Sequence, residues 1–104
     1  MEARKRPRAL IMLATAHSVE GITASGTWSR PGTVAADPAV LPLGSRIRVV
    51  GAGNYSGEYS VEDTGSKVIG RHIDIYMPTN REAKRFGKQR VRVYMLSEGD
   101  QTKK

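Results

Sequence analysis

The stretch that decides the fold is residues 70–76, which read GRHIDIY. Polar and apolar residues alternate through its last five positions, and this is the period of a half-buried β-strand. Ile73 and Ile75 then share the face toward the core, and Asp74 lies on the other face. Aspartate is disfavoured in strands, so Asp74 indicates either an exposed edge or a functional pocket.

The same alternation recurs along the chain. It is clear in residues 46–49 and 90–95 and weaker in residues 59–62, and an apolar run over residues 10–15 predicts a fifth strand. Glycine and proline separate these runs at short intervals, which is typical of short strands joined by tight turns. Because so small a chain must limit its exposed strand edges, we expect a closed or nearly closed β-barrel.

The connections are also predicted by local signals. Turn residues at 53–54 and within 65–70 each predict a hairpin. Thr79 begins a capping-box pattern with Glu82, and Gly87 stands where a left-handed residue would end a helix. The sequence therefore predicts one helix of about two turns between these residues.

Length and composition exclude several kinds of site. The chain has 104 residues, which is enough for one domain and leaves no room for a second core. It has no cysteine, so a disulfide framework, a thiolate zinc site and a cysteine nucleophile are excluded. His17 and His72 lack the spacing of paired metal ligands, and neither has a nucleophile-elbow serine beside it. We expect both histidines to be partly exposed polar side chains.

The formal net charge of +7 suggests a polyanionic partner such as nucleic acid or an acidic cell wall. Part of this charge lies in residues 1–8, where four basic residues stand against one glutamate. We expect residues 1–8 to be a basic tail, residues 9–97 the domain and residues 98–104 a polar tail. The apolar run after the basic tail is too short for a membrane span and lacks a convincing cleavage site, so no clear signal peptide is predicted.

Three segments with an aspartate carry a combined resemblance that none carries alone. They read VAADPAVLPLG at residues 34–44, VEDTG at residues 61–65 and GRHIDIY at residues 70–76. The flanking motifs are ATA at residues 14–16, TASGT at residues 23–27, and EA, FG and VRVYML within residues 82–96. In order and approximate spacing these segments resemble the 3D domain family, which is named for its three aspartates. The resemblance runs from about Leu13 to Leu96.

The resemblance implies an all-β fold, a six-stranded double-psi β-barrel with one short α-helix, related to the catalytic domain of membrane-bound lytic transglycosylase A. It also implies lytic transglycosylation of peptidoglycan, in which the bond between N-acetylmuramic acid and N-acetylglucosamine is cut and a 1,6-anhydro end is left. The implied partner is the peptidoglycan glycan strand, with no metal or organic cofactor. The implied location is the cell envelope or the outside of the cell.

By matching motifs, the resemblance also implies a role for each aspartate. Asp74 takes the place of the general acid/base, Asp63 that of its nearby partner and Asp37 that of the third aspartate. The residues that would line the same cleft and bind sugar are Thr15, Thr23, Ser25, Gly26, Thr64 and Gly65. Two departures concern sugar contacts more than chemistry: His17 stands where tyrosine is common, and residues 66–67 replace a more usual glycine-rich pair.

The chemistry explains why aspartates suit this reaction. A carboxylic acid can protonate the leaving oxygen only if burial or a neighbouring negative charge raises its pKa, and Asp63 could supply that charge to Asp74. The same carboxylate then accepts the proton of the muramic acid C6 hydroxyl, which attacks the anomeric carbon. Trp28 or Tyr55 could stack on a sugar face, although Trp28 is equally expected to close one end of the barrel.

Two other functions fit the same sequence. The first is a non-catalytic polysaccharide-binding module, because the same barrel serves expansin-like proteins that loosen polysaccharide without cutting it. The second is a small basic nucleic-acid-binding domain, but only the charge supports it, since the chain has no ribonucleoprotein-type aromatic motif or zinc pattern. A nucleic-acid partner is therefore not expected. A glycan hydrolase on the same scaffold is a close variant of the lytic enzyme.

Overall fold

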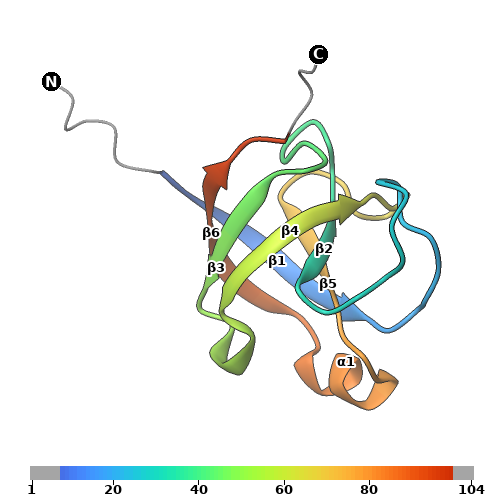
Figure 1. Cartoon of the computed structure of the whole chain (residues 1–104). Coiled ribbons are helices and arrows are strands. Elements are labelled where there is room, and N and C mark those ends of the chain that lie inside the picture. The colour runs from blue at the N-terminus through green and yellow to red at the C-terminus, as the bar shows by residue number, and fades with distance from the viewer. Residues whose placement is uncertain (1–7, 100–104) are drawn as a thin grey trace, which may run out of the picture.

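The structure is a computed structural model that describes residues 8–99, and its elements are labelled in Figure 1. The strands are β1 (Ala9–His17), β2 (Thr33–Ala36), β3 (Arg46–Val50), β4 (Gly57–Asp63), β5 (His72–Tyr76) and β6 (Gln89–Ser97). A short 3-10 helix, η2, spans Gly53–Tyr55, and the α-helix α1 spans Asn80–Phe86. Most of both predicted tails, residues 1–7 and 100–104, lies outside the described residues.

The six strands close into a barrel in the order β1-β5-β2-β4-β3-β6. β1 runs parallel to β5 and β2 runs parallel to β4, whereas the other neighbouring pairs are antiparallel. This architecture confirms the expected six-stranded double-psi β-barrel with one short α-helix. All five strands predicted from the sequence pattern are present, and closure pairs every strand of the barrel on both sides.

β2 is the strand that the sequence pattern did not reveal. All four of its residues, Thr33–Ala36, are buried, so it has no alternation of polar and apolar residues to detect. It lies between β4 and β5 and pairs with both. A buried four-residue strand is therefore the element that completes the closed barrel.

One of the two predicted hairpins is wrong. η2 joins β3 to β4, which pair antiparallel as a hairpin requires. The turn within residues 65–70 exists, because Val68 N donates to Gly65 O at 3.0 Å, but β4 and β5 do not pair since β2 lies between them. Turn residues report a local reversal of the chain, and they carry no information on which strand the next one will join.

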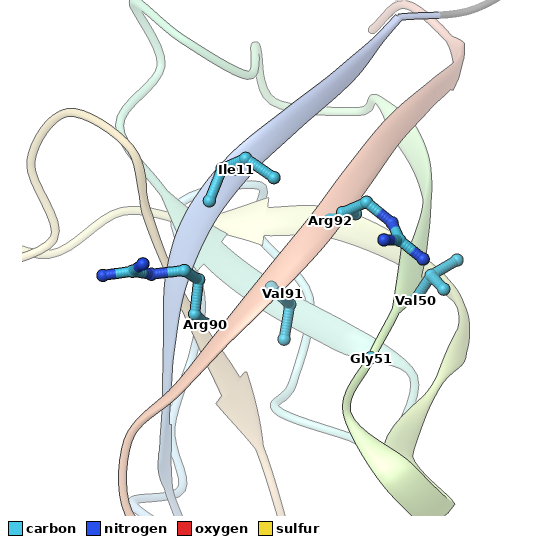
Figure 2. Close-up of a pocket in the computed structure, with 6 residues that line it drawn as sticks. All are labelled: Ile11, Val50, Gly51, Arg90, Val91 and Arg92. Atoms are coloured by element: carbon cyan, nitrogen blue, oxygen red, sulfur yellow. The ribbon is translucent and has the colours of Figure 1, made fainter.

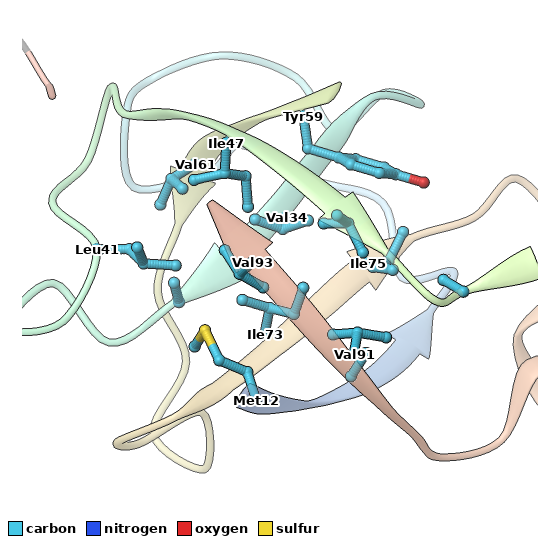
Figure 3. Close-up of a cluster of buried hydrophobic side chains, with 14 of the residues drawn as sticks. Met12, Val34, Leu41, Ile47, Tyr59, Val61, Ile73, Ile75, Val91 and Val93 are labelled. Carbon is cyan, nitrogen blue, oxygen red and sulfur yellow. The ribbon is translucent and has the colours of Figure 1, made fainter. Parts of the chain in front are cut away.

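The barrel interior holds the hydrophobic core (Figure 3). Ile47, Ile73, Ile75 and Val93 point inward from three different strands, and each is at most 1% exposed. Burying an aliphatic side chain of this size contributes about 1.5–3 kcal/mol. Because alternate residues of a strand face opposite ways, the polar neighbours of these residues, Asp74 among them, lie outside the core.

The helix α1 forms where the capping pattern predicts it. Thr79 Oγ1 accepts a hydrogen bond from Glu82 N at 3.1 Å, and Gly87 follows the helix with a φ of 66°. Ala83 and Phe86 are its buried residues. Within residues 8–99 there is no helix long and apolar enough to cross a membrane.

Candidate active site around Asp74

Strand register brings four residues from four strands into one row on the outer side of the barrel wall. Thr15 of β1 is opposite Asp74 of β5, which is also opposite Ala35 of β2. Ala35 in turn is opposite Asp63 of β4. Neighbouring strands lie about 4.8 Å apart, so the backbones of Asp74 and Asp63 are roughly 10 Å apart. We call these four residues the aspartate row.

Two side chains of β1 hold the carboxylate of Asp74. Thr15 Oγ1 donates to Asp74 Oδ1 at 2.6 Å, and His17 Nδ1 lies 2.7 Å from Asp74 Oδ2. His17 Nδ1 is buried and makes no contact in hydrogen-bond geometry with the described residues, so the short approach is best described as an ion pair. The side chains of Asp74 and His17 remain 20% and 26% exposed, which leaves both within reach of a ligand.

His72 extends this network by one more step. Its Nε2 atom lies 2.8 Å from Thr15 Oγ1. A threonine hydroxyl has one proton, so a hydroxyl that donates to Asp74 can only accept from His72. The hydrogen bonds therefore run from His72 through Thr15 to Asp74, with Nε2 of the His72 ring as the first donor.

The pKa values of Asp74 and His17 move in opposite directions. Burial acts to raise the pKa of Asp74, but the contacts with His17 and Thr15 together outweigh it and hold that pKa below its ordinary value. The contact with Asp74 raises the pKa of His17 against the effect of burial, and the charge of Asp63 adds to the rise. The expectation of a raised pKa at Asp74 is therefore wrong for the unbound protein, because the neighbour of its carboxylate is a histidine.

Asp63 adds negative charge near the same histidine and also anchors a loop. Its Oδ1 atom accepts hydrogen bonds from Ala24 N and Thr64 N, both at 2.9 Å. Ala24 belongs to the connection between β1 and β2, which we call the 18–32 loop. One carboxylate thus contributes negative charge at His17 and ties this loop to the end of β4.

The 18–32 loop forms a small hairpin fastened to β4. Arg30 binds the two oxygens of Glu62 at 3.0 and 2.8 Å, and Thr27 Oγ1 donates to the same carboxylate at 2.6 Å. Ile22 and Trp28 are bridged across the hairpin, so their side chains lie next to each other on one face. They are 67% and 57% exposed, and the expectation that Trp28 closes the barrel is therefore wrong.

The predicted sugar-binding residues occupy different surroundings. Thr15 contacts Asp74 directly, and Thr64 and Gly65 follow Asp63 at the end of β4. Thr23 is 8% exposed and its hydroxyl binds Ser25 and Thr27 within the loop. Two of the predicted residues are exposed in the 18–32 loop: Ser25, whose hydroxyl donates to Glu62 at 3.3 Å, and Gly26, which has a φ of 89° at the loop turn.

Asp37 makes no hydrogen bond to Asp74, Thr15, His17 or His72 and instead binds backbone amides. Its Oδ1 accepts from Ala39 N at 3.0 Å and its Oδ2 accepts from Gly70 N at 2.8 Å. The hydrogen bonds with Gly70 and Ala39 lower the pKa of Asp37. Both carboxylate oxygens thus hold backbone, and they connect the turn after β2 to the segment that enters β5.

A surface hollow of about 260 Å³ lies elsewhere on the barrel (Figure 2). It is lined by Ile11, Val50 and Gly51 and by residues 90–92, which belong to β1, β6 and the end of β3. The side chains of the two arginines diverge in Figure 2. None of the predicted site residues lines this hollow, so its position does not argue for a role in chemistry at Asp74.

The sequence did not reveal that His17 and His72 belong to the site. Both are partly exposed, as expected, but each also contacts the Asp74–Thr15 pair. The predicted first strand ended at residue 15, whereas β1 continues to His17. Because residues two apart in a strand share a face, a prediction that extended the strand to His17 would have placed its side chain beside that of Thr15. In the described part of the chain, no group of three potential metal-ligating side chains comes together.

Comparison with known proteins adds a family model and several relatives. The model described as 3D domain matches residues 32–97. The cell wall-binding protein YocH of Bacillus subtilis (strain 168) is 33% identical over 97 residues, which cover 85% of this chain and 32% of that protein. The putative cell wall shaping protein YabE of the same organism is 38% identical over 65 residues, which cover 62% of this chain and 15% of that protein. The chain thus spans about a third or less of these relatives.

Solved structures share the fold. The crystal structure of MltA from Escherichia coli, described as a unique lytic transglycosylase fold, matches with a TM-score of 0.60 and 21% identity. The match covers 80% of this chain and 28% of that one. MltA with bound chitohexaose matches with a TM-score of 0.61 and 18% identity over 78% of this chain and 29% of that one. At these identities the likeness concerns the barrel itself.

Proposed function

Because the chain belongs to the 3D domain family, we propose that it is a lytic transglycosylase that cuts the glycan strands of peptidoglycan in the cell envelope. The observation that carries the proposal is the setting of Asp74, a partly buried strand carboxylate held by Thr15 at 2.6 Å and by His17 at 2.7 Å. The names of the relatives support a cell-wall substrate, and the barrel of a lytic transglycosylase has the same fold.

In the proposed reaction Asp74 acts as both general acid and general base. It gives a proton to the oxygen that leaves C1 of the muramic acid unit, and it receives the proton of the C6 hydroxyl. The bond between C1 and the leaving oxygen breaks, a bond between C1 and O6 forms, and no water is consumed. The negative charge of Asp63, the partner in this proposal, stabilises the positive charge that develops at C1.

The surfaces around the aspartate row suit a sugar chain. The exposed pair of Ile22 and Trp28 offers an apolar face for stacking on a sugar ring, and the 18–32 loop is held firmly enough to present it. Sugar hydroxyls would bond to Ser25 and Thr64, with Gly26 and Gly65 keeping the nearby backbone accessible. We assign Thr23 the task of holding the loop.

We assign Asp37 a positioning role in the same proposal. Its bond to Gly70 N fixes the segment that leads into β5, two residues before the strand begins. Because β5 carries Asp74, a shift of this segment would move the carboxylate relative to Thr15 and His17. Asp37 would then act on the reaction through the backbone, without touching the sugar.

Digestion of purified sacculi tests the proposal, with soluble products identified by mass spectrometry. The wild-type protein is expected to release muropeptides with anhydro ends, and Asp74→Asn to release them at least about a hundredfold more slowly, the usual contribution of a general acid. Glu58→Gln is the matched control, because it also removes one carboxylate, but Glu58 lies at the opposite end of β4 from Asp63 and contacts Arg46 and Arg48 of β3. Wild-type rates from a folded Asp74→Asn protein would remove Asp74 from the role.

A polysaccharide-binding module that does not cut is the second candidate function. The name of the relative YocH, a cell wall-binding protein, favours it, and so does a carboxylate that rests in its ionised form. Sedimentation with sacculi separates the two functions. Binding without any released muropeptide over a long incubation would establish the module, and release of anhydro-muropeptides would exclude it.

A further inference from the structure

We propose that His17 is a positioning residue that stores the reactive proton of the site and exchanges it with Asp74 Oδ2. The inference rests on the proposed function, which gives the proton its destination. It comes from a conflict at Asp74: a general acid has to carry a proton when it acts, yet the neighbours of Asp74 favour its ionised form. A neighbouring group that holds the proton and can return it to Asp74 would resolve this conflict.

The geometry leaves His17 as that group. Asp74 Oδ1 already accepts a hydrogen bond from the hydroxyl of Thr15. Oδ2 is therefore the oxygen that can exchange a proton with a neighbouring group. His17 Nδ1 lies 2.7 Å from Oδ2 and is buried, with no other partner among residues 8–99. His72 is not equivalent, because its Nε2 atom contacts Thr15 at 2.8 Å and meets the carboxylate only through that hydroxyl.

The groups that face His17 favour its protonated ring. Asp74 approaches from β5, and Asp63 adds negative charge from β4, and the two together hold the pKa of His17 above its ordinary value. Tyr76 of β5 meets the ring edge-on, with the ring centroids 5.7 Å apart. Burial and the carboxylate of Glu20, at the start of the 18–32 loop, raise the pKa of the Tyr76 hydroxyl.

Other charged groups belong to the elements that pack beside β1, but none forms an ion pair or a hydrogen bond with His17 in the described part of the chain. On α1 these groups are Arg81, Glu82, Lys84 and Arg85, and on β6 they are Arg90 and Arg92. The state of the imidazole is therefore governed by carboxylates of β4 and β5.

The proton makes a closed circuit in this scheme. It passes from His17 Nδ1 to Asp74 Oδ2 as the sugar displaces water, and Asp74 then gives it to the leaving glycosidic oxygen. The C6 hydroxyl loses its own proton to Asp74 as O6 bonds to C1, and Asp74 returns that proton to His17. One bond at C1 breaks and one forms, the leaving sugar gains one proton, and the protein ends as it began.

Nuclear magnetic resonance decides where the proton rests without any need for activity. In the wild-type protein, titration of the two histidine rings is expected to give His17 a pKa above 6.5, the ordinary value. Asp74→Asn should lower the pKa of His17 by at least about one pH unit, because burial then acts without the carboxylate that opposes it. Glu58→Gln, which removes a distant carboxylate, should leave the pKa of His17 within about 0.2 units.

The pH dependence of sacculus digestion tests the delivery of the proton. His17→Gln keeps a polar side chain that cannot titrate, so Asp74 would have to be protonated from solution. The alkaline limb of the rate profile is then expected to move by more than about one pH unit toward acid, with at least about a tenfold loss of rate at neutral pH. A merely structural role for His17 would lower the rate at every pH and leave the limb in place.

The outcomes keep the two proposals apart. Anhydro products together with a His17 pKa at or below 6.5, or an unshifted alkaline limb in a folded His17→Gln protein, overturn the storage of the proton and leave the lytic activity standing. Absence of any cleavage overturns the proposed function and with it the delivery step. In that case the titration still decides whether the proton of the pair rests on His17.

Discussion

Asp74 illustrates how the neighbours of one residue decide its chemistry. The strand pattern and the family motif both single it out, but neither reveals that Thr15 and His17 hold its two oxygens. Those contacts join residues that are 57 and more positions apart in the sequence, through parallel pairing of β1 with β5. The place of Asp74 on the outer face of β5 could therefore be predicted, whereas the contacts that lower its pKa depend on the register of the two strands.

Thr15 offers the sharpest test at this scale. Thr15→Val removes the hydroxyl while keeping the shape of the side chain, so Asp74 loses a hydrogen bond that favours its ionised form. The pKa of Asp74 is expected to rise, since a bond to a charged group contributes about 1.5 kcal/mol or more. The rate of sacculus digestion is expected to fall by about tenfold, because the carboxylate loses the contact that orients it. Titration of the Asp74 carboxyl carbon by nuclear magnetic resonance measures the first effect.

Thr15→Ser is the matched control, because serine keeps the hydroxyl that bonds to Asp74 and His72. It should retain a pKa and a rate close to those of the wild type. If valine and serine behave alike, the hydroxyl has no part in holding the carboxylate. The hydrogen-bonded path from His72 to Asp74 would then be incidental.

Among the elements, those with a periodic pattern could be predicted and those without one could not. β5 and β6 alternate, and α1 carries its own cap, so their positions follow from local sequence. β2 is buried on both faces, and the 18–32 loop has only one isolated bridge, so both depend on partners far along the chain. β2, which lies beside Asp63, and the 18–32 loop, which carries Trp28, are thus the elements that the alternation of polar and apolar residues could not predict.

The 18–32 loop leads to a prediction about binding. Trp28 is 57% exposed and its loop is fixed by Arg30 and Glu62, so Trp28→Ala should change the melting temperature little. Loss of the stacking face should weaken binding to sacculi by roughly five- to tenfold, as expected for an aromatic contact worth about 1 kcal/mol. Sedimentation with sacculi measures the affinity, and Trp28→Phe, which keeps an aromatic ring, is the control. Equal binding by the alanine and phenylalanine variants would exclude stacking.

At the scale of the whole molecule, the aspartate row and the arginine-lined hollow lie on different parts of the barrel. The aspartate row crosses β1, β5, β2 and β4, whereas the arginine-lined hollow lies on β1, β6 and the end of β3 (Figure 2). The net charge of +7 therefore gives little guidance to the proposed chemistry, which would depend on carboxylates and histidines within a basic protein. Composition could suggest an anionic partner, but only the closed barrel reveals that Asp74 and Asp63 share one row across β5, β2 and β4.

The pair of Asp74 and His17 makes the stability of the whole barrel depend on pH in a way that can be measured. The pKa of Asp74 lies below its ordinary 3.8, so its contribution to stability is present above that pH and is lost as the pH falls through the folded value. The pKa of His17 lies above its ordinary 6.5, so its contribution is complete below that pH and is lost as the pH rises through the folded value. Between these limits the folded state gains from both charges.

Thermal unfolding across this range checks the sign of each contribution. The melting temperature of the wild type should exceed that of His17→Gln by the largest margin near pH 5, which lies inside the window where both groups are charged. The margin should shrink as the pH rises past the folded pKa of His17, because the wild-type ring then becomes neutral like the glutamine amide. It should also shrink in strong acid, where Asp74 takes up a proton. A margin that stays constant from mildly acidic to alkaline pH would mean that His17 supports the barrel through packing alone, and that its charge contributes nothing to the site.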